Sequence, residues 1–154
     1  MEAGLNGAAP VTFEPASAGD AEALVAIRIA AMRESLERIG RFDAQRAKDR
    51  FLANFDPAYT RHVVTDGARV GFVVVRPQDD GLLLDHLYLL PHAQGRGVGS
   101  AVLAEILADA DARGVPVRVT ALRGSDASRF YARLGFALVE QGEWDDFRRR
   151  PARA

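Results

Sequence analysis

Cysteine is absent from the 154 residues of this chain. Its absence excludes disulfide bonds, zinc sites built on thiolates and cysteine nucleophiles, and it is compatible with a reducing cytoplasm. The chain also lacks any apolar run near the roughly 18 residues that a membrane-spanning helix needs. The segment Met1–Pro10 has neither the basic start nor the apolar core of a signal peptide. We therefore expect a cytoplasmic protein in which residues 1–10 form a flexible leader and residues 11–154 form one domain.

An excess of charge of one sign is missing as well. Twenty basic side chains stand against twenty-one acidic ones, which gives a formal net charge of -1. Proteins that bind nucleic acid or anionic membranes through bulk charge carry a marked basic excess. Neither nucleic acid nor a membrane is therefore expected as a partner. The basic run Arg148–Arg153 is expected to be a solvated tail, as most such runs are.

Hydrophobic periodicity divides the chain into helices and strands. Helical spacing and capping residues predict helices over about 17–39, 43–55, 98–113 and 125–134. Ser17 with Asp20 is the predicted cap of the first helix, and Asp43 is the predicted cap of the second. Runs rich in β-branched residues, bounded by turn residues, predict strands over 11–14, 62–65, 70–76, 82–90, 115–122, 136–140 and 143–148. The pair Asp66-Gly67 predicts a hairpin turn between the second and third of these strands. The strand 82–90 is nearly continuous in apolar character, so we expect it to be central and covered on both faces. The order indicates a mixed α+β fold in which an antiparallel meander precedes a parallel strand-helix-strand crossover.

A glycine-rich turn, Gln94–Ser100, lies between a predicted strand and a predicted helix. Glycine lets the backbone turn sharply and approach a ligand, and the first turn of a helix adds unpaired N–H groups and a partial positive charge. Together these features form a cradle for a phosphate or pyrophosphate, to which Arg96 can add charge. The turn lacks the lysine of a P-loop, and its Gly-x-Gly-x-Gly spacing differs from the dinucleotide-binding fingerprint.

Two motifs in this half of the chain resemble those of the GCN5-related N-acetyltransferases, the GNAT superfamily. Residues 87–99, which read LYLLPHAQGRGVG, resemble the family's acyl-CoA motif, with Gln94, Gly97 and Gly99 on its defining positions. Residues 130–136, which read FYARLGF, resemble its second signature, Tyr-x-x-x-Gly-Phe. The resemblance extends over about 11–149. It implies the GNAT fold, a mostly antiparallel sheet of six or seven strands with about four helices, splayed at its central strands.

The resemblance also implies how acetyl-CoA binds as a cosubstrate, without any metal. The pantetheine arm lies in the splay and is hydrogen-bonded to the backbone of Leu87, Tyr88 and Leu89. The pyrophosphate rests on the turn, which comprises Gln94, Gly95, Arg96, Gly97, Val98, Gly99 and Ser100. Where the family usually has an asparagine near the start of the short helix, this chain has Ser125, which either contacts the cofactor or only caps the helix.

Tyr131 matches the family tyrosine that often protonates the departing thiolate of CoA, although it could instead be a packing residue. The acceptor amine must also lose a proton. The candidates are Asp85 and His86, which are adjacent on one strand and so point to opposite faces. We favour Asp85 as the base or as the holder of a water, against the alternative of a polar group satisfied within the sheet. Leu87 and Leu89 are candidates to bind the oxyanion through their backbone N–H groups.

The family shapes its acceptor pocket from the two early helices. Arg33, Glu34, Arg41 and Phe42 are therefore candidates to line it, although charge pairs on a solvated helix surface are the plainer interpretation. Trp144 is expected to fill core space.

The predicted activity is transfer of an acetyl group from acetyl-CoA to a primary amine by direct attack in a ternary complex. A cysteinyl acyl-enzyme is excluded because the chain has no cysteine. The alternative function is a sensor or structural module that binds acyl-CoA without turnover. The amine stays open between a small molecule and a protein. Relatives in the family are often dimers, so a homodimer is one expected state.

Overall fold

The computed structural model describes residues 10–38, 40 and 43–153, and in them seven strands and four α-helices follow the predicted order. The strand order in the sheet is β1-β2-β3-β4-β5-β7-β6. The chain divides into two compact units. Unit 1 comprises the described residues up to Val74 together with His86–Leu103, and unit 2 comprises Val75–Asp85 with the described residues from Ala104 onward. The predicted mixed fold is confirmed.

Unit 1 contains an antiparallel hairpin in its sheet. β1 (Val11–Pro15) pairs with β2 (Thr60–Thr65), which in turn pairs with β3 (Ala68–Gln78). The predicted Asp66-Gly67 turn joins β2 to β3, and its two residues have the positive φ values, 50° and 76°, that a two-residue hairpin needs. β4 (Gly81–Leu89) follows, and its end is tied to β3 because the N–H of Leu90 donates to the carbonyl of Val70 at 2.8 Å.

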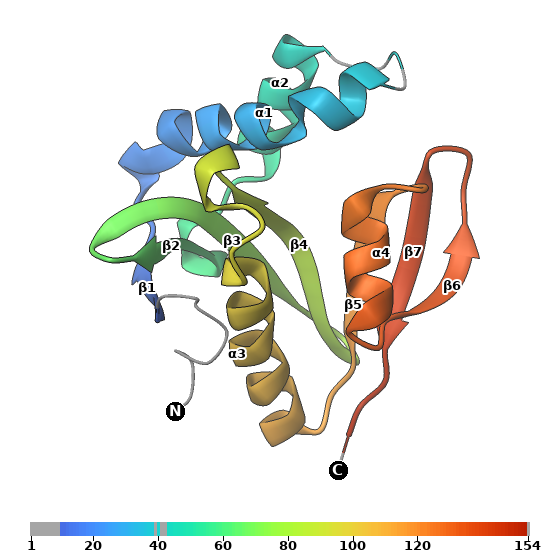
Figure 1. The fold of residues 1–154 in the computed structure, drawn as a ribbon. Helices are drawn as coiled ribbons and strands as arrows, with labels where there is room; N and C mark the ends of the chain where they lie inside the picture. Colours follow the sequence, from blue (N-terminus) through green and yellow to red (C-terminus); the bar gives the residue numbers. More distant parts are fainter. Residues whose placement is uncertain (1–9, 39, 41–42, 154) are drawn as a thin grey trace. The chain divides into compact units, whose positions relative to one another are not determined.

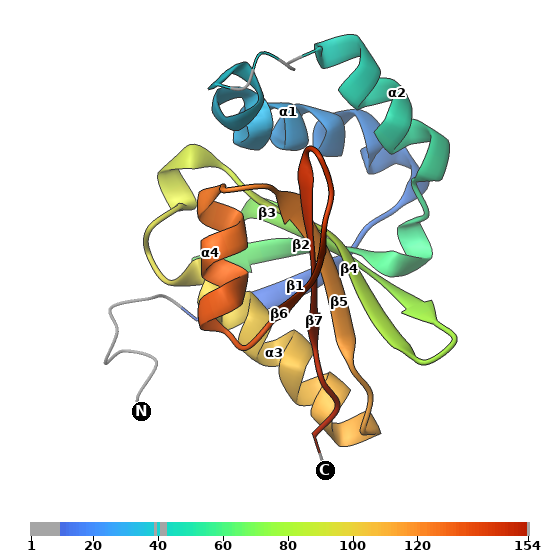
Figure 2. The same cartoon turned by 90° about the vertical axis from the view of Figure 1, so that its right-hand side faces the viewer.

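Two helices of unit 1, α1 (Ala21–Arg38) and α2 (Ala44–Asn54), lie side by side (Figures 1 and 2). Asp43 caps α2 as predicted, because its side chain accepts the N–H of Arg46 at 3.0 Å. The helices pack against β3 through a core of buried side chains, which are Leu24, Val25, Phe51, Phe72 and Val74. No helix in the described part of the chain is long and apolar enough to cross a membrane.

A buried histidine stabilises the entry to α1. Ser17 and Asp20 form the predicted capping box, and Asp20 also lies 2.9 Å from Nε2 of His62 on β2, a side chain only 2% exposed. The hydrogen bond with His62, aided by the N–H of Ser17, lowers the pKa of Asp20 from 3.8 to about 2. The ionised carboxylate is therefore favoured by the folded state.

This pair predicts a defined acid sensitivity. As the pH falls, Asp20 is protonated near its usual pKa of 3.8 in the unfolded chain but only near its lowered pKa of about 2 in the folded chain. Its contribution to stability is therefore present above pH 3.8 and is lost as the pH falls from there towards about 2. Asp20→Asn has no such titration, so the difference in free energy of unfolding between wild type and variant should shrink over this window. Urea unfolding at a series of pH values measures it. A difference that stays constant with pH contradicts the expectation.

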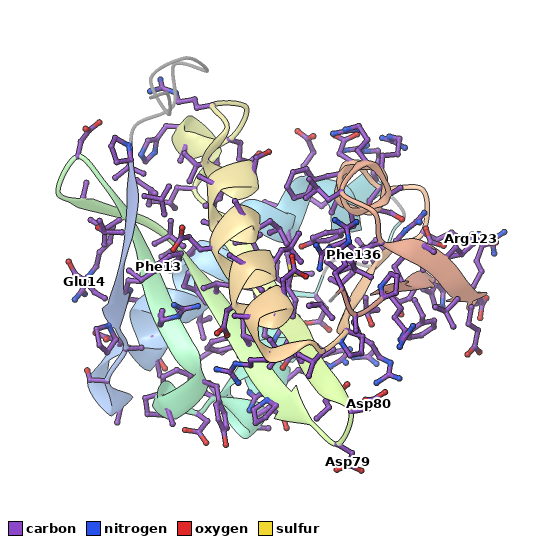
Figure 3. All side chains as sticks on the ribbon, turned by 90° about the horizontal axis from the view of Figure 1, so that it is seen from below. Phe13, Glu14, Asp79, Asp80, Arg123 and Phe136 are labelled. Atoms are coloured by element: carbon purple, nitrogen blue, oxygen red, sulfur yellow. The ribbon has the colours of Figure 1, made fainter. Side chains whose placement is uncertain are left out.

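Unit 2 is built around β7 (Asp145–Arg150), which pairs antiparallel with β5 (Val117–Leu122) on one side and β6 (Ala137–Gln141) on the other. β5 also pairs with β4 in parallel, so the predicted crossover through α3 (Val98–Arg113) is confirmed. α4 (Asp126–Arg133) lies against β5 and β7 (Figure 2). Asp80, at the tip of the turn between β3 and β4 (Figure 3), accepts two hydrogen bonds from Arg118 of β5 at 2.8 and 2.9 Å.

The prediction of a solvated basic tail is wrong for its first three arginines, because Arg148–Arg150 belong to β7. Arg150 is only 3% exposed and forms two hydrogen bonds, at 2.8 and 3.1 Å, with Asp111 of α3. Hydrogen bonding to this guanidinium lowers the pKa of Asp111. The prediction that Trp144 fills core space is wrong too, because this side chain is 41% exposed.

Candidate functional site

The second half of β4 is open, although β4 is an inner strand. Leu82 and Leu84 are buried, whereas every residue from Asp85 to Leu90 is only partly buried. The parallel ladder to β5 consists of the pairs from Leu82–Leu84 to Val117–Val119, while β4 itself continues to Leu89. The expectation of cover on both faces is therefore wrong for this half of the strand. The predicted pantetheine-binding residues Leu87, Tyr88 and Leu89 lie in this partly exposed stretch.

The backbones of β3 and β4 approach each other closely at Gly71. A Cβ atom added at this residue would lie 2.2 Å from the carbonyl oxygen of Tyr88 and 2.8 Å from the Leu89 side chain. Only glycine fits there without displacing β4. Gly71 thus helps to set the position of the backbone around Tyr88 and Leu89, which is the stretch where ligand binding is predicted.

The glycine-rich turn is hydrogen-bonded to the end of β4. A single 3-10 turn, Pro91–Ala93, leads into it, and Ala93 is buried. The side-chain amide of Gln94 donates to the carbonyl of Leu89 at 2.9 Å, and the backbone N–H of Gln94 donates to Pro91 at 3.2 Å. Gln94 therefore uses these donors to shape the turn, a role that motif matching had not indicated.

The glycine-rich turn leads directly into the first turn of α3, where several backbone N–H groups have no helical partner. Gly95 and Gly97 have φ values of 74° and 79°, in the left-handed region that favours glycine. The N–H of Ala101 donates to the carbonyl of Gly97 at 3.0 Å, so the N–H groups of the three preceding residues, Val98, Gly99 and Ser100, have no acceptor within the helix. Residues 94–97 are exposed and Val98 is buried, which anchors the turn. The backbone geometry that the predicted anion cradle needs is thus present within unit 1, while the binding of an anion there stays a prediction.

The two candidates for the base have different surroundings. In unit 2, Asp85 accepts a hydrogen bond from Nε of Arg76 at 2.8 Å, and both side chains are partly exposed. In unit 1, the His86 ring packs edge-on against Phe51, and its Nδ1 lies 3.2 Å from the hydroxyl of Tyr88. Asp85 therefore already has a cationic partner, and His86 is part of an aromatic cluster. Their assignment in catalysis stays a prediction.

α4 of unit 2 carries the other predicted residues. Ser125 is its N-cap and accepts the N–H of Ser128 at 3.1 Å, so the predicted cap is confirmed, while a contact between Ser125 and the cofactor stays a prediction. Tyr131 is 6% exposed, and its ring lies 5.4 Å from that of Phe130 and 5.5 Å from that of Phe136. These contacts show how the ring is held, while its role as an acid stays a prediction.

A polar network that sequence reasoning missed fixes α4 to the sheet. The Ser128 hydroxyl donates to Asp146 of β7 at 2.6 Å and accepts from Nε of Arg148 at 3.0 Å. The amide of Gln141 also donates to Asp146, at 2.8 Å. Hydrogen bonding, chiefly from Ser128, lowers the pKa of Asp146. Because Ser128 and Asp146 are 18 residues apart in the sequence, no local pattern could have linked them.

The structure describes only some of the residues that were candidates to line the acceptor pocket. Arg38 donates to Glu34 at 3.0 Å and Arg33 lies 3.7 Å from Glu37, all on exposed side chains, so charge pairs of the kind expected on a solvated helix surface are present. The remaining candidates for the acceptor pocket, Arg41 and Phe42, lie outside the described residues. Surface ion pairs of this kind contribute little to stability, and they do not indicate a pocket.

Comparison with known proteins agrees with the predicted family and fold. The model of the family described as Acetyltransferase (GNAT) domain matches residues 57–138, which is just over half of the chain. The GCN5-like protein acetyltransferase Rv2170 of Mycobacterium tuberculosis is 35% identical over 89 residues. That match covers 54% of this chain and 43% of the relative, so it spans less than half of the relative's length.

Solved structures share the fold at low sequence identity. The PaiA N-acetyltransferase from Thermoplasma acidophilum, solved in complex with coenzyme A, has a TM-score of 0.74 at 15% identity and covers 92% of this chain and 98% of its own. The ribosomal-protein-S18-alanine N-acetyltransferase from Escherichia coli has a TM-score of 0.70 at 19% identity, with 92% and 94% covered. Together with the family match, these likenesses show that the chain belongs to the GNAT acetyltransferase domain family.

Proposed function

We propose that this chain is an N-acetyltransferase that moves an acetyl group from acetyl-CoA to a primary amine. The observation that carries the proposal is the turn Gln94–Ser100, which leads from the open half of β4 into the first turn of α3 with two glycines at positive φ. Three helix-start amides and the side chain of Arg96 are available there to a pyrophosphate. The thioester arm would then run along the backbone of the partly buried residues Leu87–Leu89.

The proposed chemistry is direct attack in a ternary complex. The amine nitrogen bonds to the thioester carbon, and the resulting oxyanion is stabilised by a backbone N–H of Leu87 or Leu89. The carbon–sulfur bond then breaks, and Tyr131 supplies the proton that the CoA thiolate needs. The amine gives up its own proton to Asp85 through a water, and Nε of Arg76 holds one oxygen of this carboxylate by a hydrogen bond at 2.8 Å. The products are an amide and free CoA.

Two measurements test the proposal. Calorimetry with coenzyme A and with acetyl-CoA should show binding of both, and incubation with acetyl-CoA and a panel of amines should release thiol. If neither form of the cofactor binds, the proposal is wrong. If acetyl-CoA binds and no amine in a broad panel causes thiol release, the alternative of a non-catalytic acyl-CoA-binding module is favoured instead.

A further inference from the structure

Arg28, on α1 in unit 1, is a buried cation that lacks an acidic partner among the described residues. Its side chain is only 9% exposed. A guanidinium stays charged under all ordinary conditions, and burying such a charge without a counter-ion is costly. The acidic side chains of α1 and α2 have other partners. Glu22 pairs with Lys48, Glu34 with Arg38 and Glu37 with Arg33, and Asp49 accepts a hydrogen bond from Gln45. The charge of Arg28 is therefore left for something else to neutralise.

The hydrogen bonds of Arg28 leave one side of its guanidinium group unused. Nη1 donates to the carbonyl of Ala47 on α2 at 2.6 Å. The opposite edge consists of Nε and Nη2, and Nε is a buried donor without a partner, while the described residues provide no acceptor for Nη2. This edge is the fork that binds the two oxygens of a carboxylate side by side. The missing partner thus has the geometry of a carboxylate as well as its charge.

Arg28 lies close to a side chain from the open half of β4. Its guanidinium carbon lies 5.9 Å from the centroid of the Tyr88 ring, and the Tyr88 hydroxyl lies 3.2 Å from Nδ1 of His86. Tyr88 and His86 are both only partly buried, so this cluster reaches the surface beside the strand. Tyr88 stands between Leu87 and Leu89, where the proposed function puts the thioester. A carboxylate held by Arg28 would therefore keep the rest of its molecule close to the acyl group.

We propose that Arg28 binds the carboxylate of the acceptor, so that the acceptor is a small molecule with both an amine and a carboxylate, of the amino-acid class. This inference rests on the proposed function, since it names the acceptor of that reaction. The Tyr88 ring packs beneath the cation and His86 holds the Tyr88 hydroxyl, so both are positioning residues for Arg28.

The test compares matched acceptors. Thiol release from acetyl-CoA is measured with a series of amino acids, with the corresponding carboxamides, and with simple amines that lack the carboxylate. The wild type should show a kcat/KM for the amino acids that is about tenfold to a hundredfold above that for the carboxamides, as expected for a charge-assisted bond. Arg28→Met should lose this preference while still turning over the carboxamides, and Arg28→Lys should keep part of it.

A second arm separates the acceptor from the acyl donor. A carboxylate on the acyl chain could occupy the same fork, so acetyl-CoA is compared with malonyl-CoA and succinyl-CoA on one simple amine. A preference for these acidic donors that disappears in Arg28→Met overturns the assignment to the acceptor. Arg50→Met, which removes an exposed arginine from α2, is the matched control and should keep the wild-type preference.

The outcomes also distinguish this inference from the proposed function. Equal turnover of amino acids and carboxamides by the wild type overturns the role of Arg28 but leaves the transferase intact. An equal loss for both acceptor types in Arg28→Met shows that Arg28 only holds α1 to α2 through Ala47, and this also overturns the inference. If the variants do not fold, the wild-type comparison and competitive inhibition by simple carboxylates decide. No thiol release with any pair of substrates refutes the proposed function itself.

Discussion

Gly97→Ala is expected to weaken the binding of coenzyme A by about a hundredfold. Gly97 has a φ of 79°, where an L-residue is strained by roughly 1–2 kcal/mol. Relief of that strain would turn the following amides of Val98 and Gly99 away from the pyrophosphate. A hydrogen bond to a charged group contributes roughly 1.5–3 kcal/mol, and losing about this much corresponds to about two orders of magnitude in Kd. Isothermal titration calorimetry with coenzyme A measures the change.

Gly114→Ala is the matched control for this experiment. Gly114 follows the last residue of α3 with a φ of 67°, and a Cβ atom there meets nothing within 4 Å. Both substitutions should therefore lower the melting temperature to a similar extent, because both put alanine in the left-handed region. Only the change at Gly97 should affect the affinity for coenzyme A. Wild-type affinity in Gly97→Ala would show that the turn does not hold the pyrophosphate.

The turn could be predicted from the sequence because everything that defines it is local. Glycines at fixed spacing, a preceding proline and an apolar strand lie within one short segment, and the structure has them in the predicted places. Other features are also defined by residues close together in the sequence, namely the helix caps at Asp43 and Ser125 and the hairpin turn at Asp66-Gly67. In each case the chemistry of a few neighbouring residues decides the backbone conformation.

The openness of β4 could not be predicted in this way. An apolar run such as Leu82–Leu90 is typical of a strand buried on both faces. Whether it is buried depends on how far a neighbouring strand stays paired with it, and the ladder to β5 ends at Leu84. That property belongs to the tertiary structure. The partly exposed apolar residues beyond Leu84 are those that the proposed function assigns to the thioester arm.

Buried arginines were missed for a related reason. In a sequence, Arg150 looks like part of a basic tail and Arg28 like one charge on a helix. The partner of Arg150 is Asp111, 39 residues earlier, and Arg28 meets Ala47 on another helix, 19 residues later. Only the folded chain shows that the first is paired with a carboxylate and that the second has no carboxylate partner among the described residues. The difference between them supports the assignment of a ligand to Arg28.

Tyr131→Phe is expected to lower kcat by about a hundredfold without changing the affinity for coenzyme A. When the amine has attacked, the carbon–sulfur bond breaks only as fast as the thiolate can be stabilised, and the hydroxyl is the proposed proton donor. Phenylalanine keeps the ring contacts with Phe130 and Phe136, so the packing of α4 should be retained. Thiol release gives kcat, and calorimetry with coenzyme A gives Kd for the same preparation.

Tyr59→Phe is the control, since it removes the hydroxyl of a tyrosine that is 39% exposed in unit 1, and it should leave both constants unchanged. The two constants for Tyr131→Phe then separate three roles for the hydroxyl. A lower kcat with the wild-type Kd supports proton donation, and a weaker Kd with the wild-type kcat indicates that the hydroxyl only binds the cofactor. If neither constant changes, Tyr131 is a packing residue, and the proton for the thiolate must come from solvent or from another side chain.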